Sequence, residues 1–265
     1  MGLKGWDLGL VVPLQDPTPF SPFIPTEWQD ALRQVAEFGY EGVELAITDP
    51  TLLDLRGIAG VVQREGLRVL AIATGQTTWV NGLSICASED KSREKAIQRM
   101  GAYVRFAKHF EAVVIVGSIR GANKDANLLV TSLRECTSFD PSVRITLEPL
   151  NRYESSLVNT VREALEIIER VGAENLGIHI DTFHANIEEA NIREAFRAAQ
   201  EKLFHVDLAD SNRWVPGYGH LAFNEVWQAL AEINYKGHLV IECLPYPSAE
   251  AVLCTAERIR LQWGR

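Results

Sequence analysis

The sequence has neither a long apolar run nor an excess of positive charge. No stretch reaches the roughly 18 consecutive apolar residues of a membrane span, and the opening segment MGLKGWDLGL has no apolar run of signal-peptide length. With 26 Lys and Arg against 35 Asp and Glu, the net charge is −9. This argues against nucleic-acid and membrane partners, because both are bound by a basic face. We therefore expect a soluble, cytoplasmic protein.

Cysteines are few and scattered. The 265 residues contain four, with no CxxC pair and none of the density of a disulfide framework. A hydrophobic content of 46% with 23% charged residues is typical of a globular protein that buries a large core. Because no linker, low-complexity segment or block of charge divides the chain, we predict a single domain over residues 1–265.

What the sequence does contain is a repeat. Short β-branched apolar runs alternate with longer stretches of helical period. The runs predict eight strands: Leu8–Val12, Gly42–Leu45, Leu67–Ala73, Ala112–Val116, Val143–Glu148, Leu176–Asp181, Leu203–Leu208 and His238–Glu242. The stretches predict helices within Thr26–Phe38, Pro50–Glu65, Glu89–Phe110, Asn123–Ser138, Thr160–Val171, Glu188–Ala199, Asn224–Ile233 and Ser248–Trp263. Left-handed caps are expected where glycine separates a helix from the next strand, at Gly39, Gly66, Gly172 and Gly237.

Eight strand-then-helix units predict an α/β protein with a closed parallel sheet, a single (β/α)8 TIM barrel. A doubly wound open sheet is the alternative, but it usually carries a Gly-rich phosphate loop after its first strand. Here residues 13–20 of that loop read Pro-Leu-Gln-Asp-Pro-Thr-Pro-Phe, which does not cradle phosphate. The barrel is therefore favoured.

Carboxylates follow five of the apolar runs, and the catalytic residues of such barrels lie at the carboxyl ends of the strands. One such carboxylate is more often a helix cap or an ion-pair partner than a catalyst. Five on one rim repel each other unless a positive charge lies among them, and a divalent cation with oxygen ligands is the simplest solution. The five are Glu44, Glu148, Asp181, Asp207 and Glu242.

Two neighbouring segments add other polar groups. His184 follows Asp181 by three residues, in the connection that leads to the next helix. After the seventh strand, Asp210-Ser-Asn-Arg213 and Pro216-Gly-Tyr-Gly-His220 form a long polar loop. That loop can aim a cation inward.

These segments resemble a known family, the D-tagatose/D-psicose 3-epimerases of the xylose-isomerase-like barrels. The resemblance spans the second to the eighth strand. It rests on Glu148-Pro-Leu-Asn-Arg-Tyr-Glu154, Asp181-Thr-Phe-His184, Ala209-Asp-Ser-Asn-Arg213 with Pro216-Gly-Tyr-Gly219, and Val240-Ile-Glu-Cys243. The first of these motifs is specific for this branch, and a similar subgroup acts on 5-keto-L-gluconate.

The resemblance implies a metal-dependent sugar epimerase that inverts C3, next to the keto group of a ketose or keto-sugar acid, through an ene-diolate. It implies one divalent ion, Mn²⁺ or Mg²⁺ with Co²⁺ as a further candidate, and a homodimer or homotetramer. It also implies residue roles: Glu148 and Glu242 as acid/base pair and metal ligands, Asp181 as a third ligand, and Glu154, His184 and Arg213 as substrate contacts.

The remaining ligand position falls on Asp207, where the family has a histidine. Asp207 ligates directly in one reading, giving an all-carboxylate site that favours Mg²⁺ or Mn²⁺. In a second, His205 substitutes, which requires a backbone shift of about 6–7 Å. In a third, the site is weakened and the chain binds sugar without efficient turnover. We favour direct ligation, with His179 as a hydrogen-bond partner of Asp207 or Asp181. Four carboxylates around one ion also predict a raised pKa or a nearby arginine.

Three residues keep two interpretations each. Arg120 is either a surface residue at a helix start or a clamp for a substrate carboxylate. Trp79 is either a wall against the sugar or a cap on the barrel. Glu44 either belongs to the site or only forms hydrogen bonds at the barrel mouth.

Rival functions remain. An aldose–ketose isomerase, or a hydroxypyruvate-type isomerase, would use the same scaffold and intermediate but deliver the proton elsewhere. An apurinic-site endonuclease would need more histidines for a zinc cluster and a basic surface, whereas this chain has six histidines and a negative charge.

Overall fold

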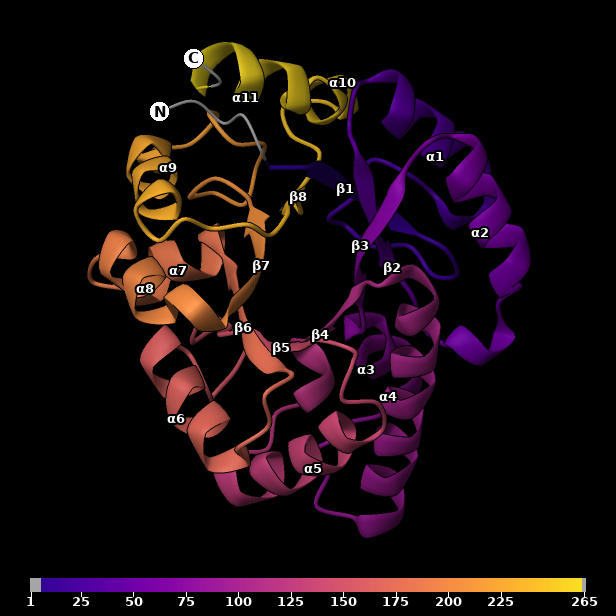
Figure 1. Ribbon diagram of the computed structural model, residues 1–265, viewed down its shortest axis with the longest axis vertical. Helices are drawn as coiled ribbons and strands as arrows, with labels where there is room; N and C mark the ends of the chain where they lie inside the picture. The colour runs from indigo at the N-terminus through magenta and orange to yellow at the C-terminus, as the bar shows by residue number, and fades with distance from the viewer. Residues whose placement is uncertain (1–5, 264–265) are drawn as a thin grey trace.

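The computed structural model describes residues 6–263, and in this part of the chain eight parallel strands close into a barrel (Figure 1). Each strand pairs with the next along the chain, and β8 closes the ring by pairing with β1. The predicted (β/α)8 fold is therefore confirmed. Residues 1–5 and 264–265, which the single-domain prediction includes, lie outside the described part. The strands are β1 (Leu8–Pro13), β2 (Gly42–Ala46), β3 (Arg68–Ala73), β4 (Val113–Val116), β5 (Ile145–Leu147), β6 (Leu176–Asp181), β7 (Leu203–Leu208) and β8 (Leu239–Ile241).

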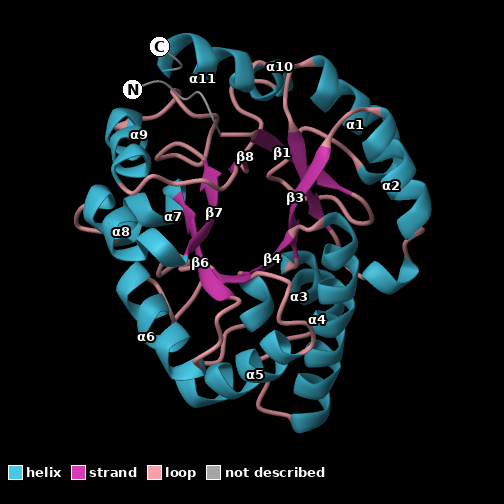
Figure 2. Ribbon diagram, viewed as in Figure 1, coloured by secondary structure: helices cyan, strands magenta, loops and turns pink. Residues whose placement is uncertain are grey.

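The helices form an outer ring around the barrel (Figure 2). The α-helices are α1 (Trp28–Glu37), α2 (Leu55–Arg64), α3 (Gly75–Asn81), α4 (Asp90–Phe110), α5 (Ala126–Ser138), α6 (Val161–Val171), α7 (Thr182–Glu188), α8 (Ile192–Ala199), α9 (Phe223–Glu232), α10 (Ala249–Leu253) and α11 (Thr255–Trp263). Short 3₁₀ turns are η1 (Pro25–Glu27), η2 (Pro50–Leu52), η3 (Ser118–Arg120) and η4 (Gln200–Lys202).

Two helices were not predicted from the sequence. Helices α3 and α7 have seven residues each and lie in connections that follow strands β3 and β6. Seven residues make two turns, which is too short for a 3.6-residue period to stand out. Two predicted stretches are also broken in the structure: 50–65 divides into η2 and α2, and 248–263 divides into α10 and α11.

Helix ends follow the expected capping chemistry with one exception. Helix α6 begins with a capping box between Thr160 and Glu163 and is followed by the C-cap Gly172, whose φ is 74°. Gly39 and Gly66 are left-handed as predicted. The prediction for Gly237 was wrong, because Asn234, with φ 53°, is the left-handed residue that follows α9. Asparagine tolerates this conformation better than most residues with a side chain.

The barrel is apolar at its walls and polar in part of its interior. Val11, Ala46, Leu70 and Val240 form one small apolar cluster of inward-facing residues. The inward positions of β6 and β7 instead carry buried histidine and aspartate, which places charge inside the barrel. None of the helices within residues 6–263 is both long and apolar enough to cross a membrane. All four cysteines are free thiols.

Candidate active site

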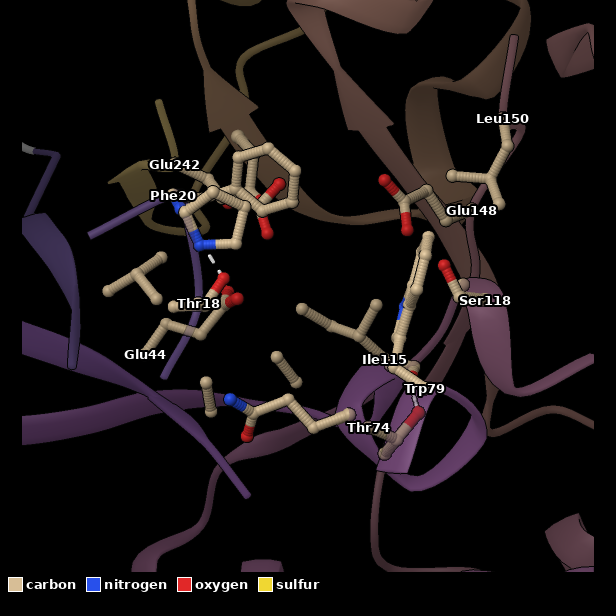
Figure 3. Close-up of a pocket in the computed structure, with 18 of the residues that line it drawn as sticks. Thr18, Phe20, Glu44, Thr74, Trp79, Ile115, Ser118, Glu148, Leu150 and Glu242 are labelled. Carbon is tan, nitrogen blue, oxygen red and sulfur yellow. Dashed lines mark hydrogen bonds between the residues drawn. The ribbon is translucent and has the colours of Figure 1, made fainter. Parts of the chain in front are cut away.

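A cavity of about 290 Å³ opens at the carboxyl ends of the strands. Glu148 lies on one side of it, and Glu242 and Glu44 lie on the opposite side, with their carboxylates directed toward the space between (Figure 3). Asp207 also lines the cavity, so four of the five predicted strand-end carboxylates meet there. The fifth, Asp181, contacts His184, which lines the cavity.

Glu148 follows β5 and is almost completely buried. A glycine at the end of β4 makes room for it: a Cβ on Gly117 would lie 2.2 Å from Glu148 Oε2. A side chain there would push the carboxylate out of this position. Burial raises the pKa of Glu148 to about 8, and the negative charge of Asp207 acts in the same direction. Glu148 is therefore able to hold a proton near neutral pH.

Asp181 ends β6 and caps α7. Its Oδ1 accepts the backbone N–H of Phe183 at 2.8 Å, which is the ordinary role of a helix N-cap. Its Oδ2 is buried without a hydrogen-bond partner among the described residues and lies 3.5 Å from His184 Nε2. Burial raises the pKa of Asp181 to about 8. Capping thus occupies one oxygen and leaves the other for a ligand.

His184 lies in α7 rather than in a loop, and its tautomer follows from its contacts. Its Nδ1 accepts the backbone N–H of Asn151 at 3.2 Å. A backbone N–H can only donate, so the ring hydrogen is on Nε2, which lies 3.7 Å from Glu148 Oε1. Burial lowers the pKa of His184 well below its ordinary value, so the ring is neutral. His184 therefore presents one N–H donor to the cavity.

The loop after β7 is folded around Asp210. The carboxylate of Asp210 accepts the backbone N–H groups of Ser211, Gly217 and Leu221, at 2.7, 2.7 and 3.0 Å. The backbone N–H of Arg213 donates to the Asp210 carbonyl at 2.8 Å, and Arg213 has a left-handed φ of 60°. These contacts fix the direction of Arg213. They confirm the prediction that this loop aims a cation inward.

The guanidinium of Arg213 lies between acidic and aromatic groups. Nη1 donates to Glu154 Oε1 at 2.8 Å, and Nη2 lies 3.9 Å from Glu242 Oε2. The rings of Phe20 and Phe183 flank it, with centroids 3.8 and 4.9 Å from Cζ. Burial by itself would lower the pKa of Arg213, but the surrounding carboxylates, Glu242 foremost, raise it. Arg213 is a permanent cation at the cavity wall.

Asp207 is held between two imidazoles. Its Oδ1 accepts a hydrogen bond from His205 Nε2 at 3.0 Å, and its Oδ2 lies 3.0 Å from His179 Nε2. Burial opposes ionisation of Asp207, but the two rings outweigh it and hold the pKa of Asp207 below its ordinary value. Burial likewise opposes a charged His205, yet Asp207 and Glu44 raise the pKa of His205 to about 10. His179 therefore lies beside Asp207, one of its two expected partners, and His205 contacts the same carboxylate.

Glu44 lines the cavity and also contacts His205, so features of both of its interpretations are present. It follows Val43 in β2, is 1% exposed, and its Oε2 lies 3.0 Å from His205 Nε2. Burial and the negative charge of Asp207 raise the pKa of Glu44 to about 7. The same two causes raise the pKa of Glu242 well above its ordinary value. The predicted raised pKa values and nearby arginine are both present.

The donor atoms fit a hard divalent cation. Oxygen or nitrogen atoms of three residues lie within 4.8 Å of one another in each of two groups along the cavity. Carboxylate oxygens dominate both groups and are the ligands that Mg²⁺ and Mn²⁺ prefer. The unpartnered Oδ2 of Asp181 is the kind of atom such a cation satisfies. The groups are Glu148, Asp181 and His184, and Glu44, Asp207 and Glu242; a third group, His179, His205 and Asp207, is richer in nitrogen.

Arg120 does not reach the cavity. It is 1% exposed, and its guanidinium donates to the backbone carbonyls of Glu148 and Val158. Neither a surface position nor a clamp for a substrate carboxylate fits this geometry, because its Nη groups already bond buried carbonyls. Trp79 lies on α3 at the mouth of the cavity, 75% exposed, with its ring beside the open space (Figure 3).

Sequence reasoning missed some contacts and simplified others. Phe20 lies in the loop after β1 and lines the cavity, and the signal that could have identified it is that every loop following a barrel strand faces this end. Asn151 lies inside the 148–154 motif, and its backbone N–H orients His184. Strands β5 and β8, which precede Glu148 and Glu242, are three strands apart in the closed ring, with β6 and β7 between.

Comparison with known proteins gives consistent results. Residues 32–260 match the family described as xylose isomerase-like TIM barrel. A D-psicose 3-epimerase of Enterocloster bolteae is 44% identical over 115 residues, 43% of this chain and 38% of that enzyme. An L-ribulose 3-epimerase of Mesorhizobium japonicum is 28% identical over 230 residues, 82% of this chain and 75% of that enzyme. The structure of D-allulose 3-epimerase from Methylomonas sp. with D-allulose shares the fold, with TM-score 0.82, 21% identity and 99% of both chains covered. The family resemblance is confirmed.

Proposed function

This chain belongs to the xylose isomerase-like TIM barrel family, and on that premise we propose that it is a metal-dependent epimerase that inverts C3 of a ketose. The observation that carries the proposal is a continuous row of groups across the cavity. His184 Nε2 lies 3.7 Å from Glu148 Oε1 and 3.5 Å from Arg213 Nη2. Arg213 Nη2 in turn lies 3.9 Å from Glu242 Oε2. Two carboxylates thus face one space, with two hydrogen-bond donors between them.

Inversion requires a proton to leave one face of C3 and another to arrive on the other face. The intermediate is a planar ene-diolate, and Glu148 and Glu242 approach it from different sides (Figure 3). One carboxylate accepts the proton from C3 while the other, as a carboxylic acid, donates its proton to the opposite face. Their raised pKa values favour this mixed protonation near neutral pH. After turnover the two have exchanged roles, ready for the reverse reaction.

His184 and Arg213 act on the substrate oxygens. The Nε2–H of His184 donates to the ketone oxygen or its neighbour, and the charge of Arg213 stabilises the negative charge that develops there. Glu154 and the flanking rings hold the guanidinium in this position. Because these donors are fixed before the reaction, little reorganisation is needed when charge appears.

Glu148, Asp181, Asp207 and Glu242 are the residues that would hold a divalent cation, Mn²⁺ or Mg²⁺ with Co²⁺ as a further candidate. Such a cation supplies positive charge beside the ketone oxygen, which makes the neighbouring carbon more acidic. The all-oxygen donor set favours the harder ions of this series.

The lining of the cavity favours a neutral sugar over a keto-acid. Of the described residues that line it, Arg213 is the one with a permanent positive charge, and it is already paired with Glu154. A substrate carboxylate would need a further cation. Phe20 and Trp79 instead offer apolar faces, suited to the C–H side of a ketose. We therefore propose a neutral ketose rather than 5-keto-L-gluconate.

The test is hydrogen exchange in heavy water with Mg²⁺ and a panel of ketopentoses, ketohexoses and 5-keto-gluconate, followed by proton NMR. We expect deuterium at C3 together with the C3 epimer of a neutral ketose. Both are abolished by a chelator and by Glu242→Gln, while Glu174→Gln, an exposed control, behaves like wild type. Deuterium at C1 would identify an isomerase instead. No exchange with any divalent ion would contradict catalysis and leave a sugar-binding barrel.

Two further expectations accompany this proposal. The free cysteines are compatible with the reducing cytoplasm that the sequence predicts. A homodimer or homotetramer is the assembly that the family resemblance predicts, and light scattering measures it directly.

A further inference from the structure

We infer that Glu44 is an additional ligand of the divalent cation, so that strand β2 contributes to a metal site otherwise built from the strands β5 to β8. The inference rests on the metal dependence in the proposed function and adds one residue to the coordination. It starts from Asp207. Both oxygens of Asp207 already contact imidazoles. The oxygens of Asp207 are therefore committed in part to other contacts.

Glu44 offers a carboxylate oxygen that is available to a cation. Its Oε2 is bound to His205, but its Oε1 has no hydrogen-bond partner among the described residues. The side chain is 1% exposed and lines the cavity, so water does not freely satisfy this oxygen. A buried carboxylate oxygen without a partner is unfavourable, and a cation in the cavity would remove that penalty.

The geometry brings this oxygen to the predicted ligands. Ligand atoms of Glu44, Asp207 and Glu242 all lie within 4.8 Å of one another. Two oxygens bound to the same Mg²⁺ or Mn²⁺, each at about 2.1 Å, are at most about 4.2 Å apart, so small side-chain adjustments bring the three onto one ion. Figure 3 shows the carboxylates of Glu44 and Glu242 on the same side of the cavity.

The charges around this group allow another carboxylate. The ring of His205 contacts both Glu44 and Asp207, and the guanidinium of Arg213 lies near Glu242. These two side chains offset part of the negative charge that a fifth carboxylate adds. A role for Glu44 that is limited to orienting His205 explains only one of its two oxygens.

The experiment titrates metal-stripped protein with Mn²⁺ and measures free Mn²⁺ by electron paramagnetic resonance. Glu44→Gln keeps an oxygen that accepts from His205 but removes the anionic ligand, and we expect it to raise the Kd for Mn²⁺ by about 10- to 100-fold. Glu174→Gln is the control: Glu174 is exposed and lies outside the cavity lining and the ligand groups, so its Kd stays within about twofold of wild type. Circular dichroism and thermal unfolding confirm that each variant is folded.

Electron spin-echo envelope modulation of the Mn²⁺ complex distinguishes ligation from an indirect effect. We expect no directly coordinated nitrogen in the wild-type protein, and a new nitrogen coupling in Glu44→His, because the imidazole then occupies a ligand position. An unchanged Kd in Glu44→Gln, or no new nitrogen coupling in Glu44→His, overturns the inference while leaving metal dependence intact. If wild type binds no Mn²⁺ at all, the metal dependence itself fails, and the inference with it.

Discussion

The guanidinium carbon of Arg213 lies 3.8 Å from the centroid of the Phe20 ring. The first residue belongs to the loop after β7 and the second to the loop after β1, so the contact joins two loops that flank the loop after β8. An arginine over an aromatic face is stabilised by the ring quadrupole, and the ring also shields it from water. Phe20 thus helps to fix the cation that faces Glu242.

Phe20→Leu tests this contact. Leucine keeps an apolar side chain in the loop but removes the aromatic face, so we expect kcat/KM to fall by about 5- to 30-fold, corresponding to a contact of about 1–2 kcal/mol. Steady-state kinetics with the sugar identified by the exchange assay measure the effect. Phe110→Leu, at the far end of α4, is the matched control and should leave kcat/KM unchanged. An equal loss in both variants would contradict a specific role for Phe20.

Arg120→Met tests whether Arg120 is a structural residue. Methionine fills similar space but leaves the carbonyls of Glu148 and Val158 without their donors, and we expect the free energy of unfolding to drop by about 3–5 kcal/mol. Urea denaturation measures it, with Arg33→Met as a surface control that changes stability by less than about 1 kcal/mol. If Arg120 instead clamps a substrate carboxylate, stability is retained and the KM for 5-keto-gluconate rises selectively.

Asp207→Asn tests the buried pair between Asp207 and His205. Removing the charge of Asp207 leaves Glu44 as the carboxylate that raises the pKa of His205. That pKa therefore falls from about 10 toward its ordinary value. Near neutral pH we expect a loss of about 3–5 kcal/mol in the free energy of unfolding, because a buried charge loses its partner. Histidine NMR titration and urea denaturation report the two effects. Asp90→Asn, which removes an exposed pair with Arg93, is the control, and a similar effect of both variants would refute the pairing.

The stability of chelated protein should fall as pH rises. Glu148 and Asp181 have pKa values of about 8 in the folded protein, above their ordinary values of 4.5 and 3.8. Between about pH 4 and 8 the folded protein therefore holds protons that the unfolded chain has released, and the free energy of unfolding decreases by on the order of a few kcal/mol. The raised pKa of His205 extends the decline from about pH 6.5 to 10.

Thermal unfolding in a chelator and in excess Mg²⁺, across this pH range, measures the decline. Mg²⁺ should flatten it, because a bound cation stabilises the ionised carboxylates. Glu148→Gln should reduce the slope in the chelator by removing one titrating group. A slope that is the same in wild type and in this variant would show that Glu148 does not titrate in the folded protein.

Much of the fold was open to prediction because its pattern is local. The strands agree with the predicted runs to within two residues at each end, since an apolar run between two helical stretches carries its own boundaries. Helices α3 and α7 could not be predicted from the sequence, because seven residues are too few to show a helical period. The carboxylates of the rim were also predictable, because each stands directly after an apolar run and a closed barrel brings all strand ends to one face.

The sequence by itself determined the eight-unit barrel and the set of carboxylates at its rim. Only the tertiary structure decided which partners those carboxylates have. Glu44 and His205 are 161 residues apart, and Arg120 donates to carbonyls 28 and 38 residues away. Such contacts depend on closure of the ring and on packing between segments that are far apart in the sequence. Periodicity fixes the side of a strand on which a residue lies, but only packing fixes the partner that it contacts there.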